Sequence, residues 1–133
     1  MEQKGLGFHV PTPDLRTALL IEFARRGYAI YANAFDIIRI NDPARPIDKI
    51  DPARDFDDIV IYEIKSTNRA LNSTWSRYFF SLSTAELLIA QSLQKRFRFA
   101  LVNITTKDHL DLSLTDIFAR AAAIYPSWSI RFK

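Results

Sequence analysis

The stretch DIVIYEIK, residues 58–65, is the part of the sequence from which the fold is best predicted. Its run of Ile, Val and Tyr predicts a strand that is buried on both faces. Side chains alternate across a strand, so Glu63 and Lys65 share one face with Ile59 and Ile61. A carboxylate and an ammonium at the end of a core strand either pair as a structural salt bridge or hold something small and charged.

The composition is that of one ordinary globular domain. The chain has 133 residues, of which 48% are apolar and 25% are charged, and these values exclude a disordered chain. It contains no cysteine, which excludes disulfides and thiolate metal sites. No apolar run approaches the roughly 18 residues of a membrane span, and residues 1–10 lack a signal-peptide pattern. We therefore expect a single domain over residues 1–133, in the cytoplasm and without a membrane partner.

Charge is distributed unevenly, although the net charge is only +3. Residues 36–58 contain seven acids and four bases, whereas residues 65–98 contain six bases and one acid, Glu86. An acidic segment followed by a basic one is typical of a polyanion partner with metal chemistry at its edge. Ordinary surface charge gives the same pattern, so charge alone leaves both interpretations open.

A helix is predicted before the strand. Residues 12–14, Thr-Pro-Asp, are typical of a helix start, and apolar residues continue at helical spacing until Gly27 ends the element. Glu22 falls on or beside the buried stripe of this helix. A glutamate rarely occupies such a position without a partner.

Two further helices follow the strand. Ser83–Glu86 matches a capping box, with Glu86 at its third helical position, and opens a helix that continues to Arg96. Ser113–Asp116 gives a weaker capping signal for a last helix, over residues 117–125, which Pro126 ends.

The remaining strands are predicted from short apolar runs. They are residues 28–31, 35–40, 98–105 and 128–132, with an extended piece at 77–82. Residues 41–57 hold three prolines and no periodicity, so they form a long loop, and residues 106–113 form a connector. The order of elements predicts a mixed α/β domain in which helices cover a central sheet.

Asp36 is the residue that can supply a second carboxylate beside Glu63. If the strand of residues 35–40 pairs with that of 58–65 as a hairpin, Asp36 lies opposite Glu63 on one face. Two adjacent carboxylates repel each other and need a cation; without sulfur the natural choice is a hard ion, Mg²⁺ or Mn²⁺, with oxygen ligands. Lys65 adds a positive charge that can steady an attacking hydroxide or a phosphate oxygen.

This order of features resembles the PD-(D/E)XK, or restriction-endonuclease-like, nuclease superfamily in its resolvase-like and Mrr-like branches. A helix with Glu22, a strand with Asp36 and a hydrophobic strand that ends Glu63-x-Lys65 match its αβββαβ core over most of the chain. The resemblance implies that Asp36 and Glu63, with the carbonyl of Ile64 and with Glu22, bind one or two Mg²⁺ ions. It also implies that Lys65 is the catalytic lysine.

Two departures from the family pattern stand out. Phe35 occupies the position at which the family's name places proline, and the separation between Asp36 and Glu63 is longer than in compact members. The resemblance implies a Mg²⁺-dependent endonuclease of restriction, repair or mobile-element type, which cuts DNA to leave a 5′-phosphate and a 3′-hydroxyl. It further implies a homodimer or a subunit of a larger nucleic-acid-processing assembly.

A basic and aromatic stretch follows the predicted site, and such a stretch can track phosphates and stack bases. The residues expected to contact nucleic acid are Arg69, Trp75, Arg77, Tyr78, Lys95 and Arg96. Core packing of the aromatic residues explains the same pattern. Lys95 and Arg96 also end a helix, where cations are favoured in any case.

Three alternatives remain open at this level. Glu63 and Lys65 can form a surface ion pair, worth at most about 1 kcal/mol. The domain can be a non-catalytic nucleic-acid-binding or assembly module that retains the nuclease fold. It can also be an unrelated α/β domain that binds a small anionic ligand.

Overall fold

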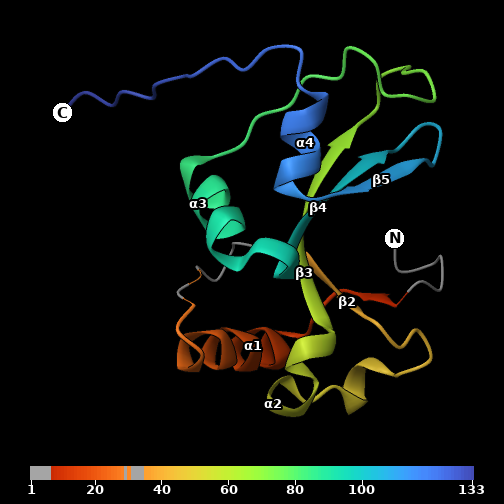
Figure 1. The fold of residues 1–133 in the computed structure, drawn as a ribbon, viewed down its shortest axis with the longest axis vertical. Helices are drawn as coiled ribbons and strands as arrows, with labels where there is room; N and C mark the ends of the chain where they lie inside the picture. Colours follow the sequence, from red (N-terminus) through yellow and green to blue (C-terminus); the bar gives the residue numbers. More distant parts are fainter. Residues whose placement is uncertain (1–6, 29, 31–34) are drawn as a thin grey trace.

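A central sheet with helices packed on one face forms the protein (Figure 1), seen in a computed structural model that describes residues 7–28, 30 and 35–133. The five strands, in spatial order, are β1 (Phe8–His9), β2 (Ile37–Ile40), β3 (Ile59–Thr67), β4 (Phe97–Asn103) and β5 (His109–Leu112). The helices are α1 (Pro13–Arg25), the short α2 (Pro52–Asp55), α3 (Thr84–Leu93) and α4 (Leu114–Arg120). β3 and β4 run parallel, and the other neighbouring strands run antiparallel. The predicted mixed α/β class is confirmed.

β3 is the central strand and contains the stretch from which the fold was predicted. Its first half pairs with β2, from Ile40 opposite Ile59 to Ile37 opposite Tyr62. Its second half continues beside β4 as far as Thr67. Ile37, the first residue of β2, pairs with Tyr62, so β3 continues past Tyr62 without β2 beside it. We call this point the fork. Glu63 is the first residue of β3 beyond this fork.

The alternation of side chains along β3 separates two cores. Ile59 and Ile61 face the helices and are almost completely buried, whereas Tyr62 belongs to a smaller cluster on the other face. The helix-side core includes Leu19, Phe23, Ile38, Ile40, Ile59, Ile61, Ile89, Leu93, Phe97, Phe99 and Ile117. Glu63 and Lys65 follow Ile59 and Ile61 on this helix side, as the alternation predicts.

An ion-pair network covers the opposite face of the sheet. The Asp111 carboxylate of β5 accepts hydrogen bonds from the Tyr62 hydroxyl at 2.6 Å, from Arg39 at 3.0 Å and from Arg98 at 2.5 Å. Burial, together with the hydrogen bond to Asp111, raises the pKa of Tyr62. The network therefore connects strands β2 to β5 on the side without helices.

The long loop predicted over residues 41–57 contains local helical structure. It holds the 3₁₀ turn Ile47–Lys49, then α2, and then the 3₁₀ turn Phe56–Asp58. Asp55 is buried there and is paired with Arg45 and Arg54. The hydrogen bond from Arg54, with further contributions from the Asp51 amide and from Arg45, lowers the pKa of Asp55 to about 2.

Two helix predictions need correction. The last helix ends at Arg120 instead of Tyr125, and the Ser113–Asp116 signal that looked weak is a complete capping box. Only Ile117 of α4 is buried, so residues 121–125 have no apolar layer beneath them that could stabilise a longer helix. None of the helices in the described ranges is long and apolar enough to cross a membrane.

Several strand predictions need correction as well. Residues 77–82 and 128–132 belong to no strand of the described sheet, and Arg77 lies in a turn with φ +65°. Tyr28 and Ile30 also lie outside the strands. The rest of the predicted strand at 28–31 lies outside the described residues. The predicted connector instead contains β5. The edge strand β1 has only two residues, which are too few for a sequence pattern to predict it.

Candidate active site

The fork between β2 and β3 fixes the position of Asp36. Its backbone N–H donates to the Tyr62 carbonyl at 2.7 Å, and its carboxylate Oδ2 accepts from the Ile64 N–H at 2.8 Å. Beyond Tyr62 the strand β2 no longer covers this side of β3, so the side chain of Asp36 satisfies the amide that β2 leaves exposed. Asp36 is thereby held beside Glu63, at the position that the hairpin pairing predicts.

The carbonyl of Ile64 faces the same gap. In a β-strand the N–H and C=O of one residue point to the same side, and the Ile64 N–H points to Asp36. A backbone carbonyl oxygen and two carboxylates therefore converge at the fork. All three supply oxygen, the donor that hard divalent cations prefer.

Glu63 is held in an unfavourable electrostatic environment. Its side chain is only 16% exposed and lies near the carboxyl groups of Asp36 and Glu86. Burial raises the pKa of Glu63 to about 7, with repulsion from Asp36 and Glu86 adding to the effect and Lys65 opposing it. Glu63 therefore retains a proton at a pH where ordinary carboxyl groups have lost theirs.

Lys65 is bound more closely by Glu86 than by Glu63. Its ammonium Nζ lies 2.7 Å and 3.0 Å from the two carboxylate oxygens of Glu86, and 3.7 Å from Glu63 Oε1. The Lys65 and Glu86 side chains are each 18% exposed. An isolated surface ion pair between Glu63 and Lys65 is therefore not the arrangement found. The ammonium joins β3 to α3.

Glu86 is a site residue that the sequence assigned to a helix cap. Ser83 Oγ accepts from the Glu86 N–H at 3.0 Å, which is half of a capping box. The Glu86 carboxylate, however, turns to Lys65 instead of returning to the Ser83 N–H. Its buried Oε2 atom forms the ion pair but accepts no hydrogen bond. The signal that points to it is topological, because a βαβ crossover starts its helix near the end of the first strand.

The charges at the fork fit a divalent cation. Glu63 lies near two other carboxyl groups, of Asp36 and Glu86, and near only one ammonium, of Lys65, so positive charge is in deficit. No three His, Cys, Asp or Glu side chains in the described part of the chain are placed to hold one ion together. Mg²⁺ keeps several waters and is commonly held by one or two carboxylates plus substrate phosphates. The Asp36–Glu63 pair with the Ile64 carbonyl offers donors of that kind.

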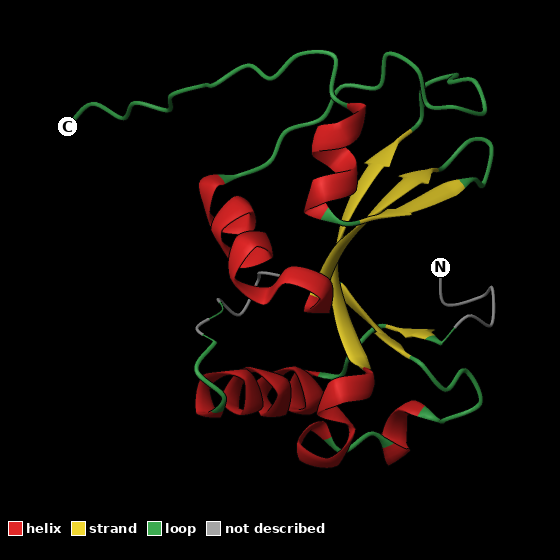
Figure 2. Cartoon of the chain, viewed as in Figure 1, coloured by secondary structure: helices red, strands yellow, loops and turns green. Residues whose placement is uncertain are grey.

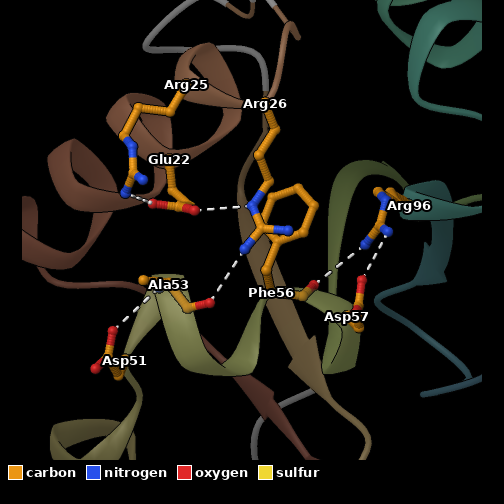
Figure 3. A network of polar contacts seen from close by, with 8 residues as sticks. All are labelled: Glu22, Arg25, Arg26, Asp51, Ala53, Phe56, Asp57 and Arg96. Atoms are coloured by element: carbon orange, nitrogen blue, oxygen red, sulfur yellow. Dashed lines mark hydrogen bonds and ion pairs between the residues drawn. The ribbon is translucent and has the colours of Figure 1, made fainter.

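Glu22 belongs to a different network (Figure 3). Its buried carboxylate accepts from Arg25 at 3.0 Å and from Arg26 at 2.8 Å, both on its own helix. Arg26 also donates to the Ala53 carbonyl of α2 at 3.1 Å and lies 4.1 Å from the centre of the Phe56 ring. Glu22 Oε1 thus fixes Arg26 against α2, and Oε2 binds Arg25. This gives Glu22 a structural role in place of the expected metal-binding one.

Arg96 holds the other side of Phe56 (Figure 3). It donates to the Phe56 carbonyl at 3.2 Å and to the Asp57 carboxylate at 2.9 Å, and its guanidinium lies 4.4 Å from the centre of the Phe56 ring. The hydrogen bond from Arg96 lowers the pKa of Asp57. Arg96 therefore ties the 3₁₀ turn Gln94–Arg96, which follows α3, to the segment before β3. This arrangement favours a structural role over a phosphate contact. Lys95 beside it is exposed.

In the basic and aromatic stretch after β3, some side chains are packed and others are exposed. Trp75 is buried and packs edge-to-face on Tyr78, with ring centres 5.3 Å apart, which favours the packing interpretation for this residue. Tyr78 in turn stacks on the ring of Phe80. Arg69 and Arg77 are exposed. Phe79, for which core packing was an open interpretation, is 67% exposed.

The structure thus brings Asp36, Glu63, Lys65 and Glu86 together and places Glu22 and Arg96 in a scaffold around Phe56. Comparisons with protein-family models, with curated proteins and with solved structures find no match. The function is therefore inferred from the residues at the fork.

Proposed function

We propose that the protein is a metal-dependent nuclease that hydrolyses DNA phosphodiester bonds as an endonuclease. The observation that supports this most is the position of Asp36, which is held by the Ile64 N–H next to Glu63, with the Lys65 ammonium 3.7 Å from Glu63 Oε1. A buried carboxyl group beside other carboxylates destabilises the fold when it ionises, unless a cation joins them. Perturbed carboxyl groups of this kind are concentrated at functional sites.

Asp36, Glu63 and the Ile64 carbonyl would hold Mg²⁺, or Mn²⁺ in its place. Bound there, the cation supplies positive charge to a phosphate oxygen and lowers the pKa of a coordinated water. Asp36 is oriented for this role by the Ile64 N–H, so its carboxylate loses little freedom on binding. Glu63 would lose its retained proton, since the cation replaces it between the carboxylates.

Lys65 would act on the phosphate. Its ammonium is held by Glu86 within 3.7 Å of Glu63, so it lies beside the carboxylates without blocking either backbone contact of Asp36. A fixed positive charge at this place stabilises the extra negative charge that develops on the phosphate during attack. Glu86 would position Lys65 without contacting the substrate.

The exposed cations after β3 support a nucleic acid as the substrate. Arg69 and Arg77 follow the end of β3 in the chain and are exposed, as is the ring of Phe79. Arginines of this kind contact phosphates, and an exposed aromatic ring can stack on a base.

The test is nicking of supercoiled plasmid DNA by the purified protein in Mg²⁺. Lys65→Ala and Asp36→Asn are expected to lower the cleavage rate by roughly 100-fold or more, which is typical when an electrostatic catalytic group is lost. Asp48→Asn, a change of an exposed carboxylate in the loop before β3, is the matched control and should cleave at the wild-type rate.

Two results would refute the proposal. Salt-dependent DNA binding without cleavage in Mg²⁺ or Mn²⁺ would make the protein a non-catalytic nucleic-acid-binding module. The absence of any salt-dependent affinity for nucleic acid would favour a domain that binds a small anion.

A further inference from the structure

The segment after α4 is exposed along its whole length. Residues 121–133, which we call the aromatic arm, have no helix or strand and leave the body of the protein in the view of Figure 2. Its five large apolar side chains are between 68% and 89% exposed, and they are Ile124, Tyr125, Trp128, Ile130 and Phe132. A group of large apolar side chains as exposed as these marks an interaction surface.

The order of residues in the arm is that of a strand. Trp128, Ile130 and Phe132 alternate with Ser129 and Arg131, so an extended arm presents an apolar face and a polar face. Such a segment acquires backbone partners only at the edge of a sheet. The arm therefore has the pattern of a strand, but no strand of the described structure pairs with it.

β5 offers an edge of the kind that the arm needs. It is the last strand of the described sheet, with β4 on one side only. Leu112 packs against the helix-side core, and Leu110 shares its face by alternation. The neighbouring helix α4 carries Phe118, which is 44% exposed. An arm paired with β5 could place its apolar face beside these side chains.

We propose that the aromatic arm adds as a strand to β5 of a second copy of the chain, and that two copies exchange arms reciprocally. In the view of Figure 2 the arm runs away from β5 of its own chain, so a second copy is the better placed acceptor.

The area buried by the arms also favours two copies. Five apolar side chains of this size bury roughly 700 Å² per arm. Two reciprocal arms bury roughly 1,400 Å² of arm surface alone, which is enough for a specific dimer. This inference does not depend on the proposed nuclease function.

The test compares the mass of the full chain, by sedimentation equilibrium, with that of a Trp128→Ser, Ile130→Ser, Phe132→Ser triple variant. The wild type is expected to dimerise. The triple variant is expected to raise the dimer Kd at least roughly 100-fold, because each buried apolar side chain accounts for about tenfold or more. Arg131→Ser changes the polar face of the same arm and should leave the Kd within about threefold. Residues 121–133 are all exposed, so the variants should fold like the wild type.

Hydrogen exchange locates the acceptor strand. The amides of β5 are expected to become protected as wild-type concentration rises through the Kd, and to remain unprotected in the triple variant. A wild-type monomer at every concentration, or a dimer unaffected by the triple variant, would refute the proposal. Protection of β5 that is independent of concentration would show pairing within one chain and refute it as well. Loss of DNA affinity in the triple variant without a change in mass would show instead that the arm binds nucleic acid.

Discussion

Replacing Glu63 by Gln is expected to stabilise the metal-free protein at alkaline pH while it removes the proposed metal site. The raised pKa of Glu63 means that the folded protein holds a proton between about pH 4.5 and pH 7 that the unfolded chain releases. The stability linked to Glu63 is therefore complete below pH 4.5 and is lost as the pH rises through about 7. Gln carries no charge, so the variant avoids this loss.

The size of the effect follows from the two pKa values. The difference between the ordinary value of 4.5 and the raised value of about 7 corresponds to at most about 3.4 kcal/mol, at about 1.36 kcal/mol for each pH unit. The side chain retains 16% exposure and its neighbours can move apart, so about 1–2 kcal/mol is expected above pH 7. Below pH 4.5 the two proteins should differ by less than about 0.5 kcal/mol.

Urea denaturation in EDTA, at several pH values from 4 to 9, measures this difference. Asp48→Asn, at an exposed carboxylate, is the control and should give a small difference that does not change with pH. Saturating Mg²⁺ at pH 8 should stabilise the wild type and have no effect on Glu63→Gln. A difference between Glu63→Gln and wild type that is the same at pH 4 and pH 8 would show that Asp36, Glu63 and Glu86 do not repel one another.

Three further predictions follow from single contacts. Glu86→Ala should lower the rate of single-turnover plasmid cleavage roughly tenfold or more, because it releases Lys65. Glu86→Gln should retain more activity, because an acceptor oxygen remains. Equal rates for Glu86→Ala and wild type would show that Lys65 needs no such support. Asp111→Ala should lower the free energy of unfolding by about 2–3 kcal/mol, measured in urea, because Arg39 and Arg98 would lose the carboxylate between them and Arg98 would keep only its longer ion pair with Asp116. A loss under about 0.5 kcal/mol would contradict this. Gly7→Ala should lower the free energy of unfolding by about 2 kcal/mol or more, because φ is +85° and the new Cβ would lie 2.3 Å from a carbonyl oxygen of β2. Gly27→Ala, with φ +91° and open space around it, should lower it by about 1 kcal/mol. Equal losses would contradict the expected steric clash at Gly7.

The central strand and the position of Asp36 could be predicted because local patterns determine them. Alternation assigns Glu63 and Lys65 to the helix side of β3, and hairpin pairing then brings Asp36 opposite Glu63. These inferences need only the strand period and one pairing, so they are insensitive to the rest of the fold.

The role of Glu86 could not be predicted from its local signal. Ser83–Glu86 and Ser113–Asp116 carry the same capping pattern, yet only Asp116 returns its carboxylate to the cap. The difference is Lys65, which lies 21 residues before Glu86 in the sequence and competes successfully for its carboxylate. Such competition depends on tertiary packing. Short edge strands are missed for a similar reason, because β5 gains its stability from β4 instead of from its own four residues.

The most direct test of the site is a crystal structure of the protein soaked in Mn²⁺, with anomalous data collected for the ion. The account predicts a single strong anomalous peak at the fork, about 2.0–2.3 Å from carboxylate oxygens of both Asp36 and Glu63, and no peak there in Asp36→Asn. A fork that stays empty at saturating Mn²⁺, with Asp36 still held beside Glu63, would contradict it.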